Sequence, residues 1–190
     1  MNGYDVALFL HLLAVLLAAV AASLTTFAAV RVRAAGSAEE AAQWIGVSEK
    51  TVRAFPVAVL GLLITGTYMT HQRWAWSVSW IDAALVVLTL IVVLGSGVQR
   101  SRAVALKREL ASSGMSPRAQ RLLRDPVAWT AKMVEITLVI AVVFVMTVKP
   151  TAAECVVSLV VAMVVGVIVA VPLWRAPGVE SAALAGQVPS

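Results

Sequence analysis

Two histidines and several methionines are the side chains of this sequence that suit metal binding. His11 lies inside a long apolar run, LFLHLLAVLLAAV, and His71 lies near the end of another. Met69 and Met146 fall near the same level along their own apolar runs. Imidazole and thioether groups together suit copper, and two histidines on different helices can also hold a haem iron. The candidate metal ligands are therefore His11, His71, Met69 and Met146, and the candidate haem b ligands are the two histidines.

A simpler interpretation exists for most of these residues. His71 is followed closely by Arg73 and Trp74, so it can be an ordinary interfacial residue at a helix end. Methionines pack in apolar interiors more often than they bind metals. His11 is harder to explain in this way, because apolar residues flank it on both sides. The spacing matches no recognised metal motif.

Lys132 and Glu135 are a second candidate site. They are three residues apart, so on a helix they share a face and can form an ion pair. Counting from Arg124 at about 1.5 Å per residue places Glu135 about 16 Å from the nearer membrane boundary. An ionisable residue at that depth costs about 3 kcal/mol and faces the interior of a bundle. The pair is either a neutral packing device or a proton or ion relay in which Glu135 titrates.

The elements that carry these residues are predicted to be transmembrane helices. Of the 190 residues 61% are hydrophobic and 13% charged, whereas a soluble domain is about a quarter charged. Five apolar blocks are long enough to cross a hydrocarbon core of about 30 Å. The sequence thus predicts an all-α, five-helix membrane bundle, a four-helix core plus one, in a single domain over 1–176 with a disordered cytoplasmic tail at 177–190. The expected helices are 6–30, 54–70, 81–98, 127–148 and 152–174.

The basic residues predict the orientation of the bundle. Twelve of the 15 Lys and Arg residues fall in 31–53, in 100–125 or at Arg175, whereas the opposite side has only Arg73 and Lys149. Lys and Arg near helix ends favour the cytoplasmic side. We therefore expect a multi-pass protein of a bacterial cytoplasmic membrane with the N-terminus outside and the C-terminus inside. The net charge of +5 then needs no nucleic-acid partner, and the loop 100–125 is suited to anionic lipid.

Short polar segments connect the predicted helices. Ser37 with Glu40 forms a predicted capping box, and Ser116 before Pro117 predicts another helix start. These loops are too short for a catalytic domain and carry no nucleotide-binding signature, so an enzyme is the less favoured class. Stripes of small residues predict close helix packing, and the oligomeric state stays open, a homo-oligomer included. The stripes are Ala14, Ala18 and Ala22; Gly61 with Thr65; and Ala162, Gly166 and Ala170.

Several short stretches resemble bacterial copper-resistance D-like membrane proteins, and more closely an uncharacterised integral membrane family related to them. They are LFLHLLAVLLAAV around His11, then GLLITGTYM, W-IDAAL and MTVKP, and they span roughly residues 5–150. The resemblance implies a four-helix unit and a role for His11 in handling copper or haem. The sequence thus favours binding or movement of copper or haem near His11 on the outer side. The alternatives are a membrane redox or proton-transfer protein using Glu135 and Lys132, and a structural subunit of a membrane complex.

Overall fold

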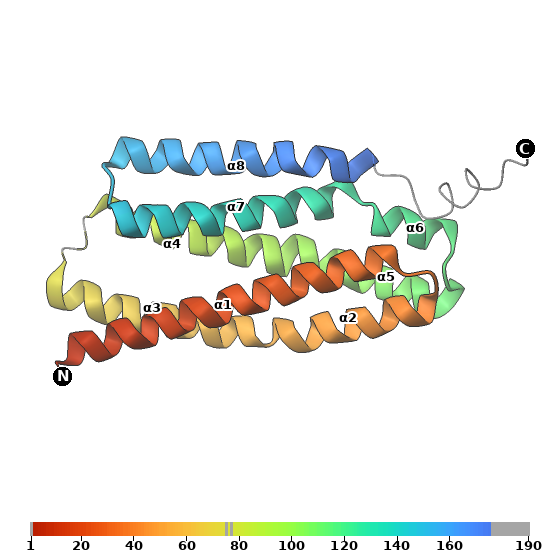
Figure 1. The fold of residues 1–190 in the computed structure, drawn as a ribbon, viewed down its shortest axis with the longest axis horizontal. Coiled ribbons are helices and arrows are strands. Elements are labelled where there is room, and N and C mark those ends of the chain that lie inside the picture. The colour runs from red at the N-terminus through yellow and green to blue at the C-terminus, as the bar shows by residue number, and fades with distance from the viewer. Residues whose placement is uncertain (1, 75, 77, 176–190) are drawn as a thin grey trace, which may run out of the picture.

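The computed structural model describes residues 2–74, 76 and 78–175, and these parts of the chain are almost entirely helical (Figure 1). No strand occurs among the described residues, as predicted. The expected tail at 177–190 lies outside them. In chain order the elements are α1 (Gly3–Ala34), α2 (Ala38–Val52), α3 (Ala54–Arg73), α4 (Ser79–Val93), the π-helix η1 (Leu94–Gln99), α5 (Arg100–Ser113), α6 (Pro117–Leu123), α7 (Pro126–Val148) and α8 (Ala152–Arg175).

Five helical stretches in the described part of the chain are long and apolar enough to cross a membrane, which confirms the predicted number. Most are longer than the apolar blocks, because the helix continues into polar sequence. Hydropathy marks where a chain leaves the membrane, whereas a helix ends where its backbone meets a cap or a breaker. The stretches are Gly3–Ala34, Ala38–Arg73, Ser79–Ser113, Pro117–Val148 and Ala152–Trp174.

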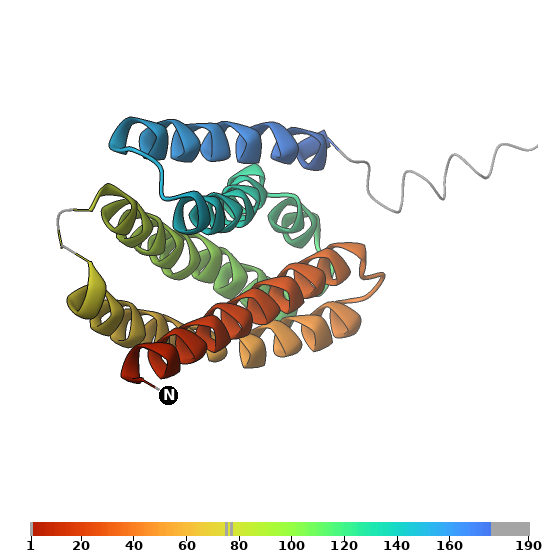
Figure 2. The same cartoon turned by 60° about the vertical axis from the view of Figure 1, so that its left-hand side comes forward.

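The five long helices divide into a pair and a trio. α1 packs along α3, and α7 packs against both α4 and α8. Figure 2 shows α8 on the outside of the trio, with α1 and α3 on the far side of α4. α2 leads into α3 of the pair, and α5 continues from α4 of the trio. Among the described residues, the main contact between the pair and the trio is that of α2 with α5. The division is therefore into two and three helices, where the sequence suggested four and one.

Small residues bring α8 close to α7. Ala162, Gly166 and Ala170 are all buried in the structure, as the predicted stripe requires. A Cβ atom added to Gly166 would lie 2.6 Å from the backbone Cα of Val134 in α7. Such a contact is possible only for glycine, so the two backbones touch at this point.

The predicted stripe on α1 is only partly correct. Ala14 is buried, but Ala18 and Ala22 are only half-buried. The buried face instead repeats every seven residues, which is the period of helices that coil around each other with a left-handed twist. A stripe at every fourth residue drifts away from such a contact. The buried alanines of this face are Ala7, Ala14, Ala21 and Ala28.

The end of the molecule opposite the N-terminus has a compact core of its own. There α2, α5 and α6 pack against the last turns of α1 (Figure 1). Ser37 caps α2 as predicted, but the Glu40 carboxylate accepts from the backbone N–H of Gly36 and not from that of Ser37. Ser116 caps α6 by accepting from the Ala119 N–H at 3.1 Å. The core residues are Val32, Ala41, Ile45, Leu106, Leu110 and Ala119.

Candidate functional site

His11 lies in the interface between α1 and α3. It occupies the face of α1 that also carries the buried alanines Ala7 and Ala14, and it is half-buried. Two glycines of α3 let the helices approach. A Cβ on Gly61 would lie 3.1 Å from the Ala14 Cβ, and a Cβ on Gly66 would lie 3.6 Å from the His11 Cε1. Because Gly66 has no side chain, the imidazole ring packs directly against the backbone of α3.

One hydrogen bond orients the His11 ring. Its Nδ1 lies 2.9 Å from the Oγ1 of Thr65, a residue buried in α3. The Thr65 hydroxyl donates its single proton to the carbonyl of Gly61 one turn earlier. Because a hydroxyl has only one proton, Thr65 must accept from His11, so Nδ1 carries the hydrogen. In the neutral ring the Nε2 atom then keeps its lone pair, which is the arrangement of a metal-binding histidine held by a second group.

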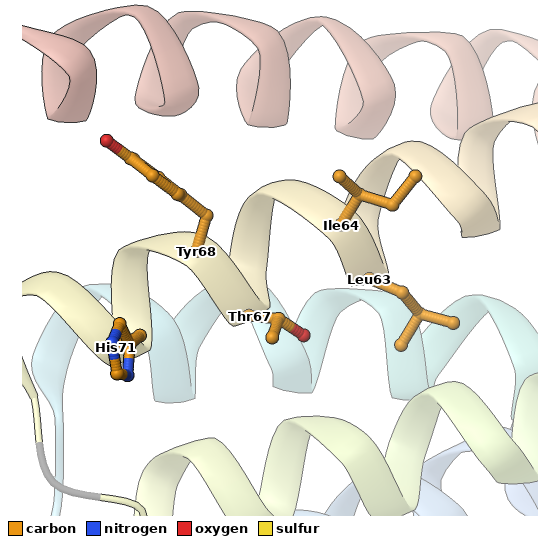
Figure 3. Close-up of a pocket in the computed structure, with 5 residues that line it drawn as sticks. All are labelled: Leu63, Ile64, Thr67, Tyr68 and His71. Carbon is orange, nitrogen blue, oxygen red and sulfur yellow. The ribbon is translucent and has the colours of Figure 1, made fainter.

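His71 does not share this interface. It is exposed at the end of α3 and lines a shallow, open hollow with Leu63, Ile64, Thr67 and Tyr68. Figure 3 shows Tyr68 pointing toward α1 and His71 pointing to the other side of α3. The Tyr68 hydroxyl lies against Gly3 of α1. The two histidines therefore lie on different faces of the α1–α3 pair.

The two candidate methionines belong to different helix groups. Met69 follows Thr65 by four residues, so it lies on the same side of α3, and it is half-buried. Met146 lies in α7, in the trio. Among the described residues, no three His, Cys, Asp or Glu side chains gather where they could hold a metal ion. The structure thus places His11 in the α1–α3 interface, with Met69 one turn of α3 beyond its partner Thr65, and leaves His71 outside that interface.

A metal ion and a haem place different demands on this interface. A porphyrin needs a pocket of several hundred Å³, of the size of other cofactor sites. The contact between Gly61 and Ala14 leaves no such space between α1 and α3 beside His11. The hollow near His71 is open and is not lined by His11. The α1–α3 interface beside His11 therefore leaves no room for a haem.

The second candidate pair forms as predicted. Lys132 Nζ donates to Glu135 Oε2 at 3.0 Å, and the two side chains are only 12% and 8% exposed. Glu135 lies on the buried face of α7, between Ala131 and Leu138. Each charge neutralises the other inside the trio.

Cation–π contacts at the two ends of the molecule were not predicted from the sequence. At the N-terminal end of the molecule, the Lys149 ammonium lies 4.3 Å and 5.6 Å from the ring centroids of Trp74 and Trp80. At the opposite end, the Arg33 guanidinium lies 5.1 Å from the ring of Trp129. The partners in each contact come from distant parts of the chain. Local sequence therefore held no signal for these contacts.

Comparison of the chain with protein-family models, curated proteins and solved structures finds no match. The resemblance to copper-resistance D-like proteins remains a prediction from the sequence.

Proposed function

We propose that the chain is a multi-pass protein of a bacterial cytoplasmic membrane, with the N-terminus outside and the α2–α5–α6 end inside. The strong excess of Lys and Arg in 31–53 and 100–125 supports this orientation. These segments lie together at the end of the molecule away from the N-terminus (Figure 1). The same orientation places His11 near the outer boundary.

Within that membrane, we propose that the chain binds Cu(I) through the Nε2 atom of His11, with the thioether of Met69 as the second donor. The observation that carries this proposal is the Thr65 hydroxyl, which holds His11 in the Nδ1–H form. Imidazole and thioether are donors that Cu(I) accepts. The proposed role is binding or transfer of the ion.

The test is a Cu(I) titration of the purified protein in detergent against a chromogenic Cu(I) chelator. Wild type should compete for one ion, and His11→Gln should not. Thr65→Val keeps the ring but removes its orienting partner, so its affinity should fall about 10- to 100-fold. His71→Gln is the matched control and should bind as wild type does. Unchanged binding by His11→Gln, or no binding by wild type, would refute the proposal.

The buried Lys132–Glu135 pair supports a second candidate function, proton transfer within the membrane. Glu135 would be the titrating group, and its burial on the interior face of α7 supports this role. In proteoliposomes carrying a pH-sensitive dye, wild type should move protons, whereas the double variant Lys132→Met with Glu135→Leu, which leaves no charge buried alone, should stay folded and move none. If wild type moves no protons, the pair is structural, as expected for a structural subunit of a membrane complex.

A further inference from the structure

Arg33 reaches from α1 into the junction of α7 and α8. Its Nη2 donates to the carbonyl of Leu173 in the last turn of α8 at 2.8 Å. Its guanidinium carbon lies over the Trp129 ring. Its Nη1 atom is buried and has no hydrogen-bond partner in the described part of the chain. A buried guanidinium N–H group that lacks a partner is costly, so this atom marks a place for an acceptor.

A second uncompensated charge lies nearby. Arg124, where α6 ends, lies beside this site, because the Trp129 ring under Arg33 donates its Nε1–H to the carbonyl of Leu123, the residue before Arg124. The carboxylate of the adjacent Asp125 is paired elsewhere, since its Oδ2 lies 3.0 Å from Nη1 of Arg102. Neither Arg33 nor Arg124 has an ion-pair partner among the described residues, and what distinguishes Arg33 is that its unpartnered Nη1 is buried. The site therefore has two positive charges and no described carboxylate to balance them.

The depth of this site matches a membrane surface. Arg33 is 22 residues from His11 on the same helix, about 33 Å at 1.5 Å per residue. A hydrocarbon core is about 30 Å thick, so the two residues lie near opposite boundaries. Trp174 also fits an interfacial level, since its Nε1 donates to Thr130 Oγ1 at 3.2 Å while its ring stays partly exposed.

We propose that Arg33 and Arg124 bind the phosphate group of an anionic phospholipid at the junction of α1, α7 and α8. A rotation of the half-buried Arg33 side chain would turn its unpartnered Nη1 outward to donate to a phosphate oxygen, and the negative charge would lie between the two guanidinium groups. Arginine suits phosphate because its planar fork presents paired N–H donors. This site is independent of copper binding at His11, which lies at the other boundary.

The test measures lipid binding by the full-length protein, stripped of lipid in a neutral detergent, with native mass spectrometry as the readout. Phosphatidylglycerol is titrated against phosphatidylcholine, and inorganic phosphate is added separately as a competitor. Wild type should prefer phosphatidylglycerol, and Arg33→Gln should reduce that affinity at least about fivefold, the effect of one arginine at a membrane surface. Arg31→Gln is the matched control. It removes the same charge two residues earlier in α1, where Arg31 forms an exposed ion pair with Glu40. It should bind as wild type does.

Three results would overturn the proposal: Arg33→Gln binding like wild type, Arg31→Gln losing as much affinity as Arg33→Gln, or inorganic phosphate competing as well as the lipid. The second result would indicate general surface charge, and the third would indicate a site for free phosphate. If Arg33→Gln does not fold, Arg124→Gln replaces it, with the same expected loss and the same refuting result.

Discussion

At the scale of single residues, the membrane part stabilises its polar side chains in two different ways. His11 shares one hydrogen bond with Thr65, on a neighbouring helix. Glu135 is balanced by Lys132 on its own helix. A neutral imidazole can donate its free lone pair to a metal ion without losing its hydrogen bond to Thr65. An ion pair behaves differently, because loss of one member leaves the other charge buried alone.

Glu135→Leu alone should therefore be strongly destabilising. Removing one member of a buried ion pair costs about 3–5 kcal/mol, since the remaining charge is left uncompensated. The double variant Lys132→Met with Glu135→Leu removes both charges and should recover most of that stability. Unfolding in mixed micelles with increasing denaturing detergent would measure both effects. If the double variant is as unstable as Glu135→Leu, an uncompensated Lys132 charge is not the cause of the lost stability.

At the scale of helices, contacts between backbones fix how the trio is assembled. Gly166→Ala places a methyl group against Val134 backbone atoms that have no freedom to move aside. Overpacking of this kind costs about 1–3 kcal/mol, so the unfolding midpoint should fall. Gly46→Ala in α2 is the matched control, because nothing lies within 4 Å of its added Cβ. It should raise stability by up to about 1 kcal/mol through helix propensity. Equal stability of the two variants would argue against close α7–α8 packing.

The π-helical turn η1 predicts an unusual tolerance to deletion. A π-turn holds one more residue than an α-turn, so deleting Gly97 should convert η1 to α-helix and leave both flanking faces in register. Deleting Ser101 in α5 instead rotates everything after it by about 100°. That rotation would turn Leu106 and Leu110 out of the core they share with α2. Membrane expression and thermal unfolding should therefore stay near wild type for the first deletion and fall sharply for the second.

At the scale of the whole molecule, the proposed orientation can be tested with single cysteines. Cys155 is buried and can be replaced by serine to give a cysteine-free background. Trp76→Cys should react with a membrane-impermeant maleimide on intact cells, because it lies in the proposed outer turn and is 55% exposed. Glu49→Cys should react only after lysis. The reverse pattern of labelling would invert the topology.

The sequence predicted some features of this molecule well, for reasons that lie in the geometry of helices. The number of spanning helices follows from hydropathy, and the Lys132–Glu135 pair follows from spacing within one helix. Spacing along a helix does not give direction around it, so the sequence could not show that His11 lies in the α1–α3 interface while His71 lies outside it. The contact between His11 and Thr65 joins residues 54 apart in sequence, and no local pattern specifies it.

The division into a pair and a trio also determines the order in which the molecule can assemble during synthesis. α1, α2 and α3 are consecutive, so the His11–Thr65 contact can form before α4 has left the ribosome. After α4, the helices α5 and α6 close the shared core against α1 and α2, and α7 and α8 complete the trio last. Because domains fold as units from the N-terminus, the earliest completed part of the nascent chain would already hold the proposed copper ligand.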